Sequence, residues 1–93
     1  MAEVEEALDK LGLTSISFKI LCYLTFRQAP AKPKDLLEAV GPVSPSTVRA
    51  RLSELRKMNL VEAGPEGYVS KVTAHDILMK LYREIIRKME AER

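Results

Sequence analysis

The sequence predicts one domain of class α+β, mainly helical with a small β-hairpin. Apolar residues recur at helical spacing through most of the chain. Near residue 65, a turn rich in glycine and proline separates two short strand-like runs. A chain of 93 residues can bury one compact core but not a second lobe. Residues 1–93 are therefore expected to form a single domain.

The N-terminal segment predicts a short amphipathic helix over residues 2–12. Its acids lie mainly in the first turn, where they suit the helix dipole, and Gly12 ends it. A second helix is expected over residues 15–27, with Thr14 as N-cap. This second helix is apolar almost all round, which is typical of a helix covered on more than one side. It is therefore expected at the centre of the domain.

The middle of the chain predicts a short helix, a tight turn and a longer helix. Two prolines in residues 28–33 end the second helix and leave room for a very short strand. A short helix follows over residues 34–40 and stops at Gly41. Ser44 then caps a helix over residues 45–58, whose first position is a proline.

The C-terminal third predicts a hairpin and a long helix. Strands over residues 60–63 and 68–72 flank the turn GPEG, so the hairpin occupies residues 60–72. Thr73 and Asp76 form a capping box at the start of a helix over residues 74–91. On this last helix Arg83, Arg87 and Lys88 are expected to lie on a solvated face.

The helix over residues 45–58 has two different sides. Val48, Leu52 and Leu55 fall together on a helical wheel and predict a core stripe. The opposite side carries small residues near the N-terminus, and the helix as a whole holds four cations against one acid. Such a side is either an ordinary solvated face or a surface that meets a polyanion. Small side chains that let a helix enter a groove roughly 12 Å wide favour the second reading, as does the positive dipole end at the helix N-terminus.

The distribution of charge agrees with the polyanion reading. The formal net charge of the chain is only +2. Residues 1–9 hold four acids and no cation, residues 10–57 hold nine cations against three acids, and residues 58–93 hold six of each. The basic excess therefore lies in the middle of the chain, which includes the helix over residues 45–58.

The order of elements resembles that of winged helix-turn-helix regulators. Their recognition helix and wing are similar to the segment SPSTVRARLSELRKMNLV and the hairpin after it, which ends in GYVS. The upstream segments LTSISFKILCYL and KPKDLLEAV are similar to helices of the MarR/SlyA and TrmB groups. The chain is also similar to compact winged-helix proteins of hyperthermophilic archaea and their viruses. The resemblance covers about residues 13–72. It implies a sequence-specific DNA-binding protein that reads pseudo-palindromic sites in the major groove.

The resemblance implies roles for particular residues. Base contacts are expected from Ser46, Thr47, Arg49, Ala50 and Ser53. Phosphate contacts are expected from Lys34, Arg51, Arg56, Lys57 and Lys71. An arginine such as Arg49 can bind guanine O6 and N7 through two hydrogen bonds. The expected wing departs from the family pattern, because Glu66 occupies its tip where a cation is usual and Lys71 is its one base. Tyr68 is expected to pack rather than bind DNA.

The terminal helices have larger apolar stripes than one small core needs, and the family pattern implies a homodimer formed through them. The alternative is that both helices fold back on their own subunit. The residues expected at the dimer interface are Val4, Leu8, Leu11, Ile77, Leu78, Leu81, Tyr82, Ile85, Ile86 and Met89. Cys22, the one cysteine, is expected to be a buried small residue, with a disulfide between two subunits as the alternative.

The remaining features argue against other classes of function. His75 is the one histidine and is expected at an exposed helix start. The sequence contains no nucleophile motif, metal-ligand cluster or phosphate-binding loop, so neither catalysis nor a cofactor is expected. The acidic start of the chain fits no targeting peptide, so we expect a cytoplasmic protein, or one of the host cytoplasm if the source is viral. Few amides and many charges suggest a thermophile. A winged-helix module that binds protein instead of DNA is the alternative function.

Overall fold

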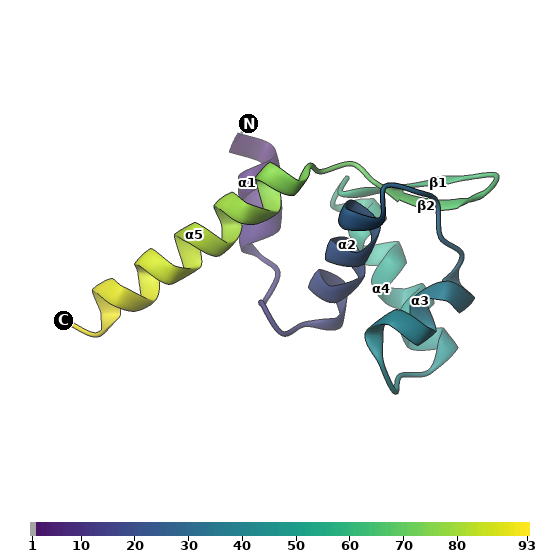
Figure 1. Cartoon of the computed structure of the whole chain (residues 1–93), viewed down its shortest axis with the longest axis horizontal. Coiled ribbons are helices and arrows are strands. Elements are labelled where there is room, and N and C mark those ends of the chain that lie inside the picture. The colour runs from purple at the N-terminus through teal and green to yellow at the C-terminus, as the bar shows by residue number, and fades with distance from the viewer. Residues whose placement is uncertain (1) are drawn as a thin grey trace.

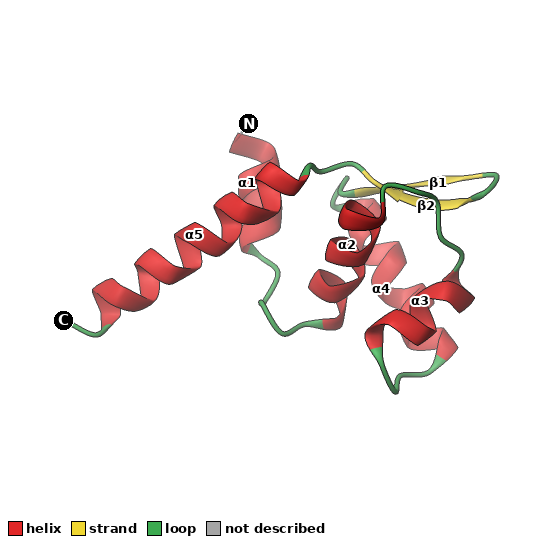
Figure 2. Cartoon of the chain, viewed as in Figure 1, coloured by secondary structure: helices red, strands yellow, loops and turns green. Residues whose placement is uncertain are grey.

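The structure, a computed structural model, describes residues 2–93. These residues form five helices and one two-stranded antiparallel hairpin (Figures 1 and 2), which confirms the mainly helical α+β class. The elements are α1 (Ala2–Asp9), α2 (Ile16–Arg27), α3 (Pro33–Val40), α4 (Pro45–Lys57), β1 (Val61–Gly64), β2 (Gly67–Ser70) and α5 (Ala74–Ala91).

Local capping chemistry determines where most helices begin. The Ser44 hydroxyl accepts a hydrogen bond of 3.1 Å from the Thr47 N–H, and Thr73 does the same for Asp76, so both predicted caps are confirmed. The prediction of Thr14 as the cap of α2 was wrong. Ser15 is the cap, because its hydroxyl accepts from the Phe18 N–H at 3.1 Å.

Four helices differ in length from the prediction, α2 and α4 by being one residue shorter. The expected helix over residues 2–12 ends at Asp9, and Lys10 and Leu11 continue it only as a turn, through hydrogen bonds to the carbonyls of Ala7 and Leu8. The turn still directs Leu11 into the core, where it is 8% exposed. The helix expected over residues 34–40 begins one residue earlier, because Pro33 occupies its first position, where a missing N–H is tolerated.

The core forms around α2, as the sequence predicts. This helix packs against α3, α4, β2 and α5 (Figure 1), and it buries Phe18, Ile20, Leu21 and Leu24. The apolar side chains of α2 are not all buried, since the Phe26 side chain is 57% exposed. Helices α3 and α4 lie together beneath α2 in Figure 1, and each contributes a buried stripe to this core.

The hairpin joins the helical core through a third short segment. Strands β1 and β2 pair from Val61 with Ser70 to Gly64 with Gly67. Ala31 forms a two-way bridge with Tyr68, with N···O distances of 3.0 and 2.8 Å, so the very short strand expected within residues 28–33 is present only as a single paired residue. Tyr68 packs against the core, as expected.

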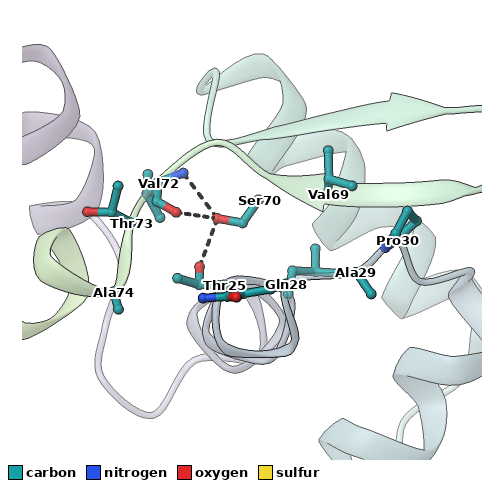
Figure 3. A pocket seen from close by; sticks show the side chains of 10 residues that line it. Thr25, Gln28, Ala29, Pro30, Val69, Ser70, Val72, Thr73 and Ala74 are labelled. Atoms are coloured by element: carbon teal, nitrogen blue, oxygen red, sulfur yellow. Dashed lines mark hydrogen bonds between the residues drawn. The ribbon is translucent and has the colours of Figure 1, made fainter.

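A cluster of hydroxyl groups fixes the junction between α2, β2 and α5. The Thr25 and Ser70 hydroxyls lie 2.8 Å apart. The Ser70 hydroxyl also donates to the Val72 carbonyl and accepts from the Val72 N–H (Figure 3). A pocket of about 380 Å³ opens beside this cluster, between the end of α2, the end of β2 and the start of α5. The junction therefore ties the hairpin and α5 to the same point of the core.

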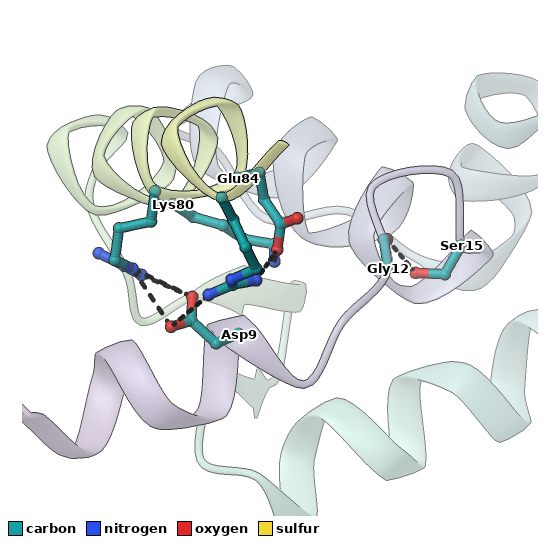
Figure 4. A network of polar contacts seen from close by, with 7 residues as sticks. Asp9, Gly12, Ser15, Lys80 and Glu84 are labelled. Atoms are coloured by element: carbon teal, nitrogen blue, oxygen red, sulfur yellow. Dashed lines mark hydrogen bonds and ion pairs between the residues drawn. The ribbon is translucent and has the colours of Figure 1, made fainter. Parts of the chain in front are cut away.

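Helix α1 is attached to α5 by a buried leucine and a bidentate ion pair. Leu8 is fully buried, and the Asp9 carboxylate, which faces α5 in Figure 4, accepts hydrogen bonds of 2.9 to 3.2 Å from the Arg83 guanidinium. This interaction lowers the pKa of Asp9 and raises that of Arg83. The expectation that Arg83 lies on a solvated face was therefore wrong, because its guanidinium is paired with Asp9. The helical spacing of residues 74–91 could not indicate this partner, which lies 74 positions away in the sequence.

Candidate nucleic-acid interface

Helix α4 is anchored by its inward face. Val48, Leu52 and Leu55 are each fully buried in the core, as their spacing predicts. They are held between α2, α3 and the start of β1, all of which pack on α4. The opposite face of α4 is therefore fixed in orientation relative to the rest of the domain.

The outward face of α4 begins with small polar side chains. Ser46, Ala50 and Ser53 are exposed, and Thr47 is half-buried. At the N-terminus the Ser44 hydroxyl lies 3.1 Å from that of Ser46 and 2.9 Å from that of Thr47. The first turn of α4 thus presents three hydroxyl groups at the positive end of the helix dipole, where a phosphate oxygen could be accepted.

Three cations flank this small-residue face. Arg49, Arg56 and Lys57 are exposed. Within residues 2–93, no side-chain ion pair engages any of the three. The structure therefore brings together Ser46, Arg49, Ala50 and Ser53 on one surface, with Arg56 and Lys57 at its C-terminal end. That combination can meet a polyanion without breaking an existing ion pair.

Arg51 differs from the other cations of α4. Its guanidinium lies 3.3 Å from the Glu54 carboxylate, one turn further along the same helix, and its side chain is 38% exposed. Its Nε atom is buried, and no hydrogen-bond partner for it is found among the described residues. A phosphate contact through Arg51 would use only the outer end of the guanidinium and would compete with Glu54.

The other residues expected to contact phosphate lie on neighbouring elements. Lys34 is exposed in the first turn of α3. Lys71 follows β2, and its ammonium donates a hydrogen bond of 2.6 Å to the Asn59 side-chain carbonyl. The hairpin itself exposes Glu62 and Glu66, so its surface is acidic. The cations expected to contact phosphate therefore lie on α3, on α4 and at the base of the hairpin.

The ten residues expected at a dimer interface divide into three groups. Leu8, Leu11 and Ile77 are buried within their own chain, so they cannot contact a second copy directly. Val4, Leu81 and Ile86 are half-buried. Those exposed on α5 are Leu78, Tyr82, Ile85 and Met89. Sequence reasoning missed Met79, which is 38% exposed beside them, and it missed Lys80, which is completely buried.

Cys22 lies half-buried on α2. Burial raises the pKa of its thiol, and the nearby Lys80 charge opposes this only in part. Its burial agrees with the expectation of a small packed residue rather than a reactive thiol. A disulfide between two copies stays a prediction, which the mobility of the protein on gels with and without reductant would test.

The described residues contain few groups suited to other chemistry. His75 is exposed at the start of α5. No group of three or more metal-ligating side chains occurs within residues 2–93. In the same residues, no helix combines the length and apolar character that crossing a lipid bilayer requires.

Comparison with protein-family models, with curated proteins and with solved structures finds no match for this chain. Its function is therefore inferred from the geometry of its own surface.

Proposed function

We propose that this chain is a winged helix-turn-helix protein that binds double-stranded DNA sequence-specifically and regulates transcription. In this proposal α3 and α4 form the helix-turn-helix, the hairpin of β1 and β2 is the wing, and α4 enters the major groove. The resemblance to MarR/SlyA and TrmB regulators, and to winged-helix proteins of hyperthermophilic archaea and their viruses, belongs to the same proposal. So does a cytoplasmic location.

One observation carries the proposal: the outward face of α4 is small along its middle, with exposed and unpaired cations along one edge and at its C-terminal end within the described residues. Ala50 and Ser53 allow close approach to a surface, while Arg49 and Lys57 reach beyond them. A solvated helix face has no physical need for small residues at these positions. A helix that enters a groove roughly 12 Å wide does need them.

The proposed contacts follow from position on the helix. Arg49 and the small residues Ser46, Thr47, Ala50 and Ser53 would face the bases. Lys34, Arg56 and Lys57, together with Lys71, would contact phosphates, and Arg51 would do so only by releasing Glu54. The acidic wing would lie outside the minor groove or touch the backbone through its N–H groups, because Glu62 and Glu66 repel phosphate.

The proposal includes a homodimer on a pseudo-palindromic site, with half-sites about 34 Å apart. The exposed apolar residues of α5 support it, since the body of the chain leaves Leu78, Tyr82, Ile85 and Met89 uncovered. In a dimer each copy would supply one recognition helix.

The acidic wing favours one competing function, a winged-helix module that binds a basic protein surface. Glu62 and Glu66 are both exposed, as such a module would require. Binding of the protein to random duplex DNA at increasing salt concentration separates the two. DNA binding predicts a steep loss of affinity with salt, because condensed counterions are released from phosphates. Absence of binding at low salt would favour the protein-binding module.

Two substitutions on α4 test whether Arg49 contacts bases and Lys57 contacts phosphates. Arg49→Ala should lower discrimination at one base pair by about 1–3 kcal/mol. Lys57→Ala should weaken specific and random DNA alike and reduce the salt slope by about one. Lys19→Ala, which removes an exposed cation from α2, is the matched control and should change neither quantity. Equal losses on specific and random DNA for both α4 variants would refute the base-reading role of Arg49.

A further inference from the structure

Two cations of helix α5, Lys80 and Arg83, direct their charged groups toward the body of their own chain. Lys80 is fully buried, with its ammonium 3.4 Å from Glu84 and 5.5 Å from the centre of the Phe18 ring. Arg83 forms the bidentate pair with Asp9. The side of α5 that meets α1 and α2 therefore carries both ion pairs and apolar contacts.

The opposite side of α5 is apolar and open. We define the α5 seam as Leu78, Tyr82, Ile85 and Met89, which are 58%, 57%, 57% and 58% exposed. Their spacings of four, three and four residues match the a and d positions of a heptad repeat. At 1.5 Å per residue the α5 seam is about 16 Å long. In Figure 1 the C-terminal part of α5 projects beyond α1 and the rest of the chain.

We propose that a second copy of the chain covers this surface, and that the two α5 helices pair in antiparallel orientation through the α5 seam. The inference rests on the homodimer of the proposed function and adds its contact surface and orientation. The spacing of four, three and four residues reads the same in both directions. A twofold axis between Tyr82 and Ile85 therefore sets Leu78 opposite the partner's Met89 and Tyr82 opposite the partner's Ile85.

Charge at the ends of α5 favours the antiparallel pairing. In a parallel pair, Glu92 would extend the seam and face the partner's Glu92, and Lys88 would lie near the partner's Arg93. Like charges in such positions are destabilising. In the antiparallel pair, Glu92 instead faces the partner's His75, whose ring N–H can donate to a carboxylate. The two helix dipoles also oppose one another, which is favourable.

Side-chain size favours the same orientation. A parallel pair would place Tyr82 against the partner's Tyr82 at the centre of the seam, with Ile85 against Ile85 in the next layer. The antiparallel pair combines one large and one smaller side chain in each central layer, which fills the interface more evenly. The exposed Met79 lies beside Leu78 and can pack at the edge of the pair.

Cysteine cross-linking tests the orientation. In a Cys22→Ser background, Leu78→Cys and Met89→Cys are prepared as separate variants and mildly oxidised, singly and as a mixture. We expect neither single variant to cross-link, because identical positions would lie about 16 Å apart, whereas a disulfide requires Cα atoms within about 7 Å. The mixture should give a covalent dimer. Cross-linking of either variant with itself would overturn the antiparallel arrangement.

Sedimentation tests the surface independently. The wild-type chain should be dimeric, and Ile85→Glu should shift the dissociation constant upward by at least 100-fold while the helical circular dichroism is retained. Ala91→Glu introduces the same charge at an exposed site outside the α5 seam and should leave the dimer intact. A monomeric wild type at all concentrations would overturn the inference, including the case in which the α5 seam binds lipid vesicles instead. Binding of monomeric Ile85→Glu to DNA would show that the recognition surface functions separately.

Discussion

Replacing Lys80 by methionine is expected to leave the free energy of unfolding unchanged or to raise it. The ammonium of Lys80 is completely buried, and its one ion-pair partner among the described residues is Glu84 at 3.4 Å. That distance exceeds the 2.7 to 2.9 Å or so of a strong charged hydrogen bond. The contact with the Phe18 ring adds a second, weaker attraction. The pair therefore compensates only part of the desolvation of the ammonium, which costs several kcal/mol.

Methionine preserves most of the length of the side chain and removes the charge. Glu84 would keep Arg87 as a partner at 3.0 Å, so the substitution leaves no carboxylate without a cation. We expect the free energy of unfolding to rise by 0 to about 2 kcal/mol. Lys80→Ala also removes the charge but leaves an empty space between the helices, and it should lower the free energy of unfolding by about 2–4 kcal/mol.

Urea denaturation followed by circular dichroism measures both variants against the wild type. All three proteins should be compared at one concentration, because a dimer is stabilised by mass action. The m-values should agree, so that midpoints report stability rather than a change in the unfolded state. A loss for Lys80→Met as large as that for Lys80→Ala would refute the reasoning, since it would show that the buried ammonium is itself stabilising.

Two further predictions concern the α1 attachment and the hairpin. The pKa of Asp9 is lowered first by its hydrogen bond with Arg83, so its contribution to stability is complete above the unfolded pKa of about 3.8 and disappears as the pH falls through the lowered value. Asp9→Asn should therefore cost about 1 kcal/mol at pH 7 and nothing in strong acid, measured by denaturation across that range; a cost independent of pH would contradict it. Gly67→Ala should cost more than Gly41→Ala. Both glycines have positive φ, 131° and 95°, but only at Gly67 would a new Cβ lie 2.6 Å from a backbone atom, the Ala31 oxygen. Equal thermal shifts for the two variants would contradict this reading.

Local chemistry made the helix boundaries predictable. Ser44 with Pro45, and Thr73 with Asp76, identify helix starts through contacts within three residues. The start of α2 was misassigned by one residue because Thr14 and Ser15 both carry a hydroxyl, and only the backbone conformation selects between them. The core stripe of α4 was predictable for the same reason as the caps, since helical spacing alone places Val48, Leu52 and Leu55 on one side.

The two faces of α5 could not be assigned from the sequence. Its apolar residues occupy more than one side of the helix, and periodicity does not say which side meets the body. The contact between Asp9 and Arg83 decides it, and that contact joins residues 74 positions apart. A lysine at position 80 would ordinarily be placed in solvent. Its burial follows from the packing of α1 and α2 around it, which only the folded structure provides.

The junction at Ser70 lies at the start of α5, so a small rotation of the helix there moves its far end by a large distance. Only Lys71, Val72 and Thr73 separate β2 from α5, and the Ser70 hydroxyl bonds to both polar backbone groups of Val72. A rigid helix of 18 residues is about 27 Å long, so a 10° rotation about this fulcrum displaces its far end by about 5 Å. A small change of angle at the hydroxyl cluster thus becomes a displacement of Met89 that approaches the width of a side chain. The alignment of the far end of α5 consequently depends on how firmly Thr25 and Ser70 hold one another, together with the contacts of Lys80 and Arg83 further along the helix.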